Sequence, residues 1–138
     1  MKINLPILLL AILLIDCKSK TSEPGGLSPK DSVQLTDLRF LTKRVAFKDV
    51  PEDTLLTAKY TFVNTGQKAL FITDISPDCS CTGYVLSKKM VPPNDSGYVL
   101  LKYSTKDKFG ESKVYVTLSA NTPVKLYSLE IVATIKDR

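Results

Sequence analysis

The chain contains no histidine and no tryptophan among its 138 residues, and only three cysteines. Without histidine it cannot form a Ser-His-Asp or Cys-His catalytic arrangement, and it cannot hold zinc through imidazole. Acid–base catalysis by histidine is excluded for the same reason. We therefore expect no enzymatic activity, apart from the thiol chemistry that two of the cysteines would allow.

The chain also lacks a concentrated basic patch, although its formal net charge is +5 from 19 Lys and Arg and 14 Asp and Glu. Its lysines are spread along the sequence, and the densest groups are Lys43-Arg44 and Lys106 with Lys108. Dispersed charge is typical of a solvated surface. Aromatic residues do not interleave with a basic stretch, so we expect no binding to nucleic acid.

A helical hydrophobic period and internal repeats are absent after the first 16 residues. Short segments of period-two alternation are present instead, and this alternation is typical of half-buried strands. Clusters of Asn, Gly, Pro and Asp separate these segments, as turns do. About seven strands over residues 32–138 predict an all-β, immunoglobulin-like β-sandwich. The clearest strand segments are 56–63, 69–75, 83–86, 98–103, 113–119 and 127–136.

The N-terminus begins with Met1-Lys2 and continues as an apolar run from Ile3 to Ile15. This run is shorter than the roughly 20 residues that a membrane-spanning helix needs. It also lacks the polar face of a helix that packs on a folded domain. A charged start followed by a short apolar run predicts a secretory signal peptide over residues 1–16.

The apolar run ends in Leu14-Ile15-Asp16-Cys17, which resembles the lipobox of bacterial lipoproteins. Leu14 matches the aliphatic residue three positions before the modified cysteine, whereas Asp16 stands where a small residue is usual. No A-x-A-like site offers an alternative cleavage point nearby. We therefore predict lipidation of Cys17 and an exported protein, anchored by lipid to a bacterial membrane and facing the periplasm or the cell exterior.

Residues 17–31 follow the predicted signal peptide and are rich in Lys, Ser, Pro and Gly. Such a composition buries too little apolar surface to fold and is typical of a flexible linker. We interpret this segment as a tether between the lipid on Cys17 and the sandwich.

Four segments of the predicted sandwich resemble motifs of a known family. Tyr60–Gly66 resembles F-x-N-T-G, and Ala69–Ile72 resembles P-L-x-I. Asp78–Thr82 resembles S-C-G-C-T, and Pro93–Gly97 resembles P-G-E-x-G. Gly110 and Asn121 also fall where that family has a glycine and a late S-x-N.

Together these motifs are similar to a bacterial domain-of-unknown-function family of small exported immunoglobulin-like proteins, whose fold is like that of hydin and major sperm protein domains. The resemblance covers about residues 55–135. Ser80 and Asn94 stand where glycine is usual in the family. The family has no established reaction. The resemblance therefore implies a fold and a location outside the cytoplasm more than it implies a function.

The Cys79-x-Cys81 pair is the one candidate chemical site, and three interpretations remain open. Export favours a disulfide. In an extended strand, the Cα atoms of residues i and i+2 lie near the upper limit of about 6.8 Å for a disulfide, so this pairing needs a local bend. Two thiolates also suit Cu(I), with Met90 as a candidate third ligand. Alternatively, both remain thiols that pack as small apolar side chains.

The leading functional hypothesis is a lipoprotein whose sandwich is a non-enzymatic binding or structural module without a cofactor. We expect two kinds of partner, the membrane through the lipid anchor and a protein or other envelope component. Sandwiches often bind through edge strands or end loops, and the segment 127–135 is a candidate surface if it lies at an edge. The alternative is a thiol-redox or copper-handling protein that uses Cys79 and Cys81.

Overall fold

The computed structural model describes residues 34–136, which form nine strands and no helix. The predicted signal peptide, Cys17 and the tether lie outside the described residues and stay predictions. Within the described part, no helix is long and apolar enough to cross a membrane. The strands are β1 (Leu38–Phe40), β2 (Arg44–Val50), β3 (Leu55–Asn64), β4 (Leu70–Pro77), β5 (Thr82–Leu86), β6 (Met90–Val91), β7 (Ser96–Ser104), β8 (Gly110–Ala120) and β9 (Tyr127–Ile135).

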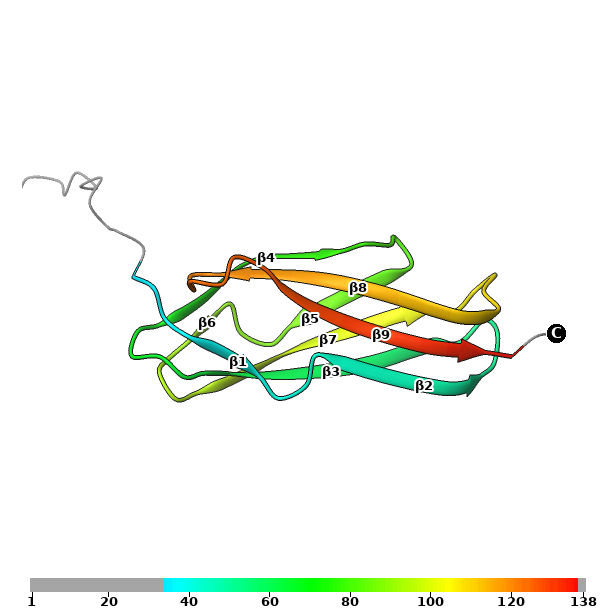
Figure 1. Ribbon diagram of the computed structural model, residues 1–138, viewed down its shortest axis with the longest axis horizontal. Coiled ribbons are helices and arrows are strands. Elements are labelled where there is room, and N and C mark those ends of the chain that lie inside the picture. The colour runs from blue at the N-terminus through cyan, green and yellow to red at the C-terminus, as the bar shows by residue number, and fades with distance from the viewer. Residues whose placement is uncertain (1–33, 137–138) are drawn as a thin grey trace, which may run out of the picture. The chain divides into compact units, whose positions relative to one another are not determined.

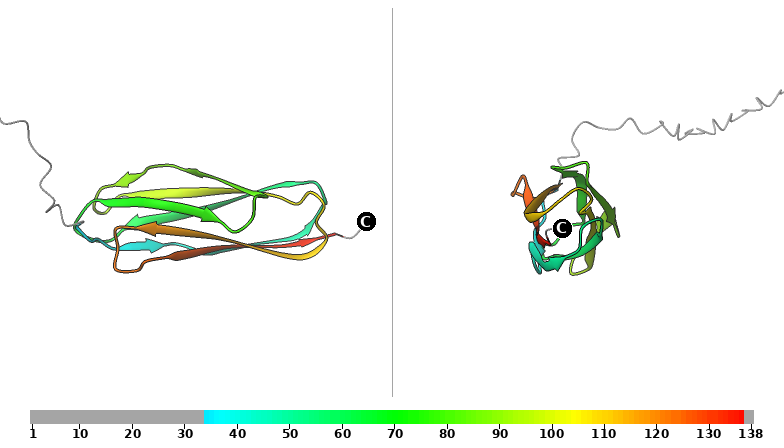
Figure 2. Two further views of the ribbon diagram at one scale, coloured as in Figure 1. Left: turned by 90° about the horizontal axis from the view of Figure 1, so that it is seen from above. Right: turned by 90° about the vertical axis from the view of Figure 1, so that its right-hand side faces the viewer.

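These strands form two sheets that pack face to face (Figures 1 and 2). One sheet has the order β1-β3-β7-β5 and the other β2-β9-β8-β4-β6. Neighbouring strands are antiparallel except β2 and β9, which are parallel. The predicted all-β, immunoglobulin-like sandwich is therefore confirmed. The strands number nine rather than about seven, because β1 and β6 are only three and two residues long.

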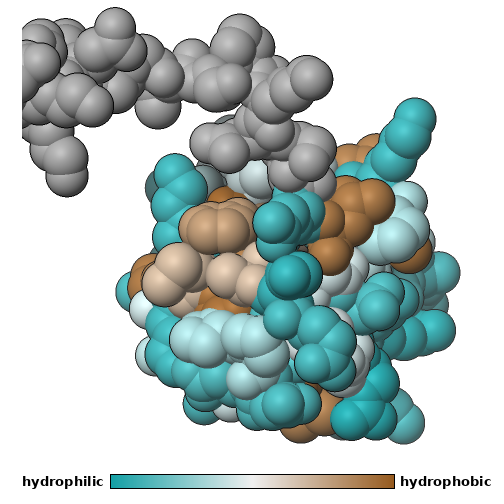
Figure 3. Space-filling view, turned by 90° about the vertical axis from the view of Figure 1, so that its left-hand side faces the viewer, coloured by the Kyte–Doolittle hydropathy of each residue, from teal (hydrophilic) through white to brown (hydrophobic). Residues whose placement is uncertain are grey.

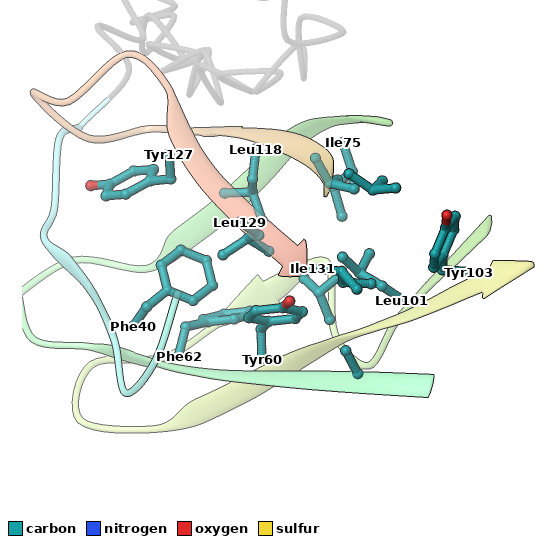
Figure 4. Packing of buried hydrophobic residues seen from close by; sticks show 14 of the residues in the cluster. Phe40, Tyr60, Phe62, Ile75, Leu101, Tyr103, Leu118, Tyr127, Leu129 and Ile131 are labelled. Atoms are coloured by element: carbon teal, nitrogen blue, oxygen red, sulfur yellow. The ribbon is translucent and has the colours of Figure 1, made fainter. Parts of the chain in front are cut away.

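The core follows from period-two alternation, since successive side chains of a strand point to opposite faces. In β3, Leu56, Ala58, Tyr60 and Phe62 are buried, as the alternation in the sequence predicts. Tyr60 and Phe62 face the other sheet together with Phe40 (Figure 4). The residues that meet them from the other sheet include Leu118, Leu129 and Ile131.

Strand β9 does not lie at an edge, so the condition under which residues 127–135 would be a candidate binding surface is not met. It pairs with β8 on one side and with β2 on the other, where Val45 lies opposite Ile131. β2 joins β9 in parallel from a distant part of the chain, and such a pairing leaves no hairpin signal in the sequence. The edge strands are β1 and β5 in one sheet, and β2 and β6 in the other.

One end of the sandwich, which we call the tether end, holds the loops 34–37, 65–69, 87–95 and 121–126. Asn64 is fully buried there and joins three of these loops. Its Nδ2 donates to the carbonyl oxygens of Lys68 (2.7 Å) and Val91 (2.9 Å). Its Oδ1 accepts from Thr36 Oγ1 at 2.9 Å and from the Gly66 amide at 3.1 Å. Buried amides need such partners, so Asn64 determines how the loops meet.

Asn121 joins the remaining loop of the tether end, 121–126, to its neighbours by hydrogen bonds of the same kind. Its Oδ1 accepts from the Phe71 amide at 2.7 Å, and its Nδ2 donates to the carbonyl oxygens of Gln34 (2.8 Å) and Ala69 (2.9 Å). The asparagines of the family motifs are therefore structural in this chain.

Backbone geometry explains which residue stands at two further motif positions. Gly66 is required by a close approach, because an added Cβ would lie 2.6 Å from the Asp37 amide nitrogen. Asn94 has a φ of 62°, in the left-handed region that glycine and asparagine tolerate best. This explains why asparagine stands in Asn94's turn where the family usually has glycine.

Candidate functional site: an open groove and a disulfide turn

Strands β4 and β5 border the open side of the sandwich. β4 pairs with β6 at Leu70 and Phe71, and the Ile72 amide donates to the Lys89 carbonyl at 3.0 Å. From Thr73 onward β4 has β8 as its single neighbour. β5 pairs with β7 alone. The two strands belong to opposite sheets and are consecutive in the chain, joined by a turn that contains Cys79 and Cys81.

A shallow groove of about 240 Å³ lies between these strands. It is smaller than the roughly 300 Å³ at which small-molecule pockets begin, so its size suits one or two side chains of a partner. Its lining is mixed and includes one charge of each sign. The lining residues are Ile72, Thr73, Asp74, Ile75, Tyr84, Leu86 and Lys89.

The backbone of β5 presents hydrogen-bonding groups to this open side. The Ser104 amide donates to the Cys81 carbonyl, and the Ser87 amide donates to the Tyr98 carbonyl, both at 3.0 Å. Backbone groups alternate in direction along a strand, so those of Tyr84 and Leu86 point away from β7. An open strand edge of this kind can accept a further strand from another chain.

The Cys79–Cys81 pair lies in the turn after β4 and not within a strand. The turn supplies the bend that a pairing requires: the Cα atoms are 5.1 Å apart and a disulfide joins the two residues. The Cys81 amide donates to Cys79 Sγ at 2.9 Å, and the Thr82 amide donates to the Cys79 carbonyl at 3.1 Å. Both cysteines are half-buried, and Cys81 packs against the core.

The structure does not bring Met90 to the cysteines. Met90 lies opposite Phe71 at the start of β4, whereas Cys79 follows the end of that strand. Strand β4 runs between the two places, and the six steps from Phe71 to Pro77 alone span about 20 Å. Within residues 34–136, no three His, Cys, Asp or Glu side chains are grouped to hold a metal ion. In the described residues Met90 is therefore not placed to serve as a third ligand beside Cys79 and Cys81.

Displaced pKa values elsewhere in the domain have structural causes. Burial raises the pKa of Tyr60, and the negative charge of Glu130 raises it further. The Tyr60 hydroxyl stays protonated and donates to the Glu130 carbonyl at 2.6 Å. At the tether end, a hydrogen bond from Lys88 lowers the pKa of Asp95. The first of these groups stabilises the core, and the second forms an exposed ion pair of 2.7 Å.

The sequence matches the profile of DUF1573, a family of proteins of unknown function, over residues 38–135. The chain belongs to this family, and the resemblance seen in its motifs is confirmed. None of the curated proteins matches the sequence.

Solved structures share the fold at low identity. A protein of unknown function from Porphyromonas gingivalis W83 has a TM-score of 0.66 at 11% identity, and the match covers 74% of this chain and 48% of that one. This chain thus spans about half the length of that protein. The ASH/PapD-like domain 7 of human CEP192 has a TM-score of 0.55 at 9% identity, covering 96% of this chain and all of that one.

The Escherichia coli chaperone DraB has a TM-score of 0.51 at 9% identity, covering 72% of this chain and 55% of that one. Chains of two Vibrio cholerae proteases and a Clostridium perfringens glycoside hydrolase also match, over about a third of their length or less. At these identities the likeness shows the fold alone, which is an immunoglobulin-like sandwich of the PapD-like type.

Proposed function

We propose that this protein is a lipid-anchored component of a bacterial cell envelope, whose sandwich binds an extended segment of a partner protein along β5. One observation carries the binding proposal: the free edge of β5 runs beside a groove of side-chain size. Main-chain hydrogen bonds to Tyr84 and Leu86 would hold the segment, and the groove would select its side chains.

Binding fits the groove better than catalysis does. Its lining offers one carboxylate, one amine and two hydroxyls but no histidine or cysteine, so the nucleophile–base pairs that use histidine or a thiol cannot form there. The fold it shares with the DraB chaperone and the PapD-like domain of CEP192 is compatible with a binding role.

The anchor is tested by growing cells that express the full chain with an alkyne-bearing fatty acid. We expect the chain to be labelled, Cys17→Ser to abolish the label, and Cys79→Ser to leave it intact. The Cys79→Ser variant is the matched control because it also removes one thiol. Labelling that survives Cys17→Ser would overturn the proposed anchor.

The binding edge is tested with a photo-crosslinking phenylalanine analogue at Tyr84. The matched control is Tyr115, which lies on the outer face of the other sheet and is similarly exposed, 42% against 46% for Tyr84. We expect a discrete crosslinked product in intact cells from position 84 and none from position 115. The same products from both positions, or none from either, would overturn binding at β5.

The rival is a thiol-redox role, and the disulfide between two cysteines that are only half-buried favours it. The double variant Cys79→Ser/Cys81→Ser separates the two functions. A binding module keeps its position-84 crosslink in this variant, whereas a redox protein that captures its partner through a thiol loses it.

A further inference from the structure

The surface of the tether end carries large apolar side chains in contact with solvent. Leu35, Phe71, Met90, Val124 and Leu126 are between 45% and 61% exposed. Figure 3 views this end and shows apolar and strongly hydrophilic residues side by side on it. Apolar side chains exposed in a group mark an interaction surface more often than scattered ones do.

Hydrogen bonds and strand pairing hold these apolar residues close together. Asn121 bonds the backbone of Gln34, next to Leu35, and the backbone of Phe71. Phe71 in turn lies opposite Met90. The two remaining residues, Val124 and Leu126, belong to the loop that Asn121 begins. The surface is thus built on a fixed framework.

The charges around this surface are mainly positive. The loops of the tether end contain four lysines against two aspartates, Asp37 and Asp95. Asp95 is neutralised by its ion pair with Lys88, which leaves Lys68, Lys89 and Lys125 exposed. The opposite end, which we call the disulfide end, holds the loops 51–54, 78–81 and 105–109. These loops have the reverse balance, four carboxylates against two lysines.

Apolar side chains interspersed with lysines match the interface of an anionic bilayer, where the former enter the headgroup region and the latter meet lipid phosphates. We propose that the tether end docks on the surface of an anionic membrane. This inference rests on the proposed lipid anchor at Cys17, because the described chain begins at this same end.

The length of the tether supports the membrane as the surface on which the tether end docks. Seventeen residues lead from Cys17 to Gln34, and a flexible chain of that length has an end-to-end distance of about 23 Å. The anchor would therefore keep the tether end near the lipid surface at a high effective concentration. Even a weak attraction then holds the domain down, with the disulfide end directed away from the membrane.

The absence of tryptophan gives a direct test, because one introduced tryptophan is the sole reporter of its position. Leu126→Trp and Phe71→Trp place it on the docking surface, and Phe109→Trp places it at the opposite end, where Phe109 is 77% exposed. The acylated full-length variants are reconstituted in vesicles of phosphatidylethanolamine and phosphatidylglycerol that contain brominated lipid. We expect quenching and a blue shift at positions 126 and 71, and neither at position 109.

The lysines are tested in the same vesicles. Each of Lys68→Gln, Lys89→Gln and Lys125→Gln should lower the ratio of docked to undocked domain about fivefold. Replacing phosphatidylglycerol by phosphatidylcholine should reduce quenching at position 126, and so should high salt. Quenching that is insensitive to both would overturn the electrostatic part of the proposal.

Other outcomes identify other occupants. Equal quenching at positions 126 and 109, in protein whose intact mass includes the acyl chains, overturns docking and leaves the anchor in place. Protein without acyl chains overturns both. A blue shift at position 126 that grows with protein concentration but shows no quenching means that a second copy covers the surface, and it overturns membrane docking. Because Leu126 lies in an exposed loop, its variant keeps the test decisive if Phe71→Trp fails to fold.

Discussion

The two ends of the sandwich are built in different ways. At the tether end, Asn64 and Asn121 reach across loops that are far apart in the sequence and bond their backbones. At the opposite end, Asp53 and Asp107 form short turns with positive φ, and Cys79 is bonded to a cysteine two residues away. Longer-range bonds there come from one fully buried side chain, that of Thr105. Its Oγ1 accepts from the Thr54 amide at 2.8 Å, and its hydroxyl donates to the carbonyl oxygens of Pro51 and Thr54, each at 3.1 Å.

The two ends differ both in what holds their loops together and in what their surfaces expose. The tether end depends on buried polar side chains, and its exposed surface is apolar and basic. The disulfide end depends on short local turns and on one buried polar side chain, that of Thr105. It also carries more acidic loops and adjoins the open side formed by β4 and β5. The two proposed interactions, with a membrane and with a partner protein, thus use different parts of one fold.

The largest expected effect is that of Asn64→Ala. It removes two donated and two accepted hydrogen bonds from a fully buried group. We expect the free energy of unfolding to fall by about 3 kcal/mol, because the buried partners lose their bonds. Urea denaturation of the full chain measures this change.

Thr105→Ala is the matched change at the disulfide end. It removes fewer bonds, so we expect a loss of about 1.5 kcal/mol. A loss as large as that of Asn64→Ala would show that both ends depend equally on buried side chains, and the comparison would fail.

An effect about half that of Asn64→Ala is expected from Cys79→Ser/Cys81→Ser. A disulfide that closes so short a loop restricts the unfolded chain little, and the chain-entropy relation gives about 1.6 kcal/mol for three residues. Urea denaturation with and without a reductant checks this value, and mass measurement after alkylation reports the state of the thiols. A loss near 4 kcal/mol would make the disulfide the main support of its end.

Tyr60 lies between the two ends, and its raised pKa predicts that the stability of the domain changes at alkaline pH. Its pKa is raised in the folded state, so its contribution to stability is complete below about pH 10 and is lost as the pH rises further. Tyr60→Phe should cost about 1 kcal/mol at neutral pH through the lost hydrogen bond to the Glu130 carbonyl.

The stability gap between wild type and Tyr60→Phe should therefore narrow above about pH 10 and then reverse. Thermal unfolding of both proteins across this range measures the gap. A constant gap would show that the hydroxyl titrates as in the unfolded chain.

The smallest effect is expected at the exposed Lys88–Asp95 pair. Lys88→Gln removes the hydrogen bond that lowers the pKa of Asp95, so this pKa should return towards its ordinary value. Any stability from the lowered pKa is present at neutral pH and is lost as the pH falls through the folded pKa. Carboxyl NMR titration measures the pKa, while urea denaturation at pH 7 should show no clear change for so exposed a pair.

The candidate site could be predicted only in part. The Cys79-x-Cys81 spacing marks the disulfide turn in the sequence, because two nearby thiols are rare and conspicuous. The groove has no such marker, since Ile72 and Tyr84 belong to strands in opposite sheets. The buried asparagines were visible as motif residues, yet nothing in the sequence distinguishes a loop-joining asparagine from a ligand-binding one.

The sequence by itself determined the all-β class, the buried faces of the long strands and most of the turns. These features depend on local alternation and on residues that tolerate turn geometry, both of which act within a few residues. Only the tertiary structure decided that β9 is interior, that β5 is an edge, and that Leu35, Phe71 and Leu126 share one end. Such relations arise from pairing and packing between distant segments, and many pairings are compatible with the same alternation until the whole sandwich selects one.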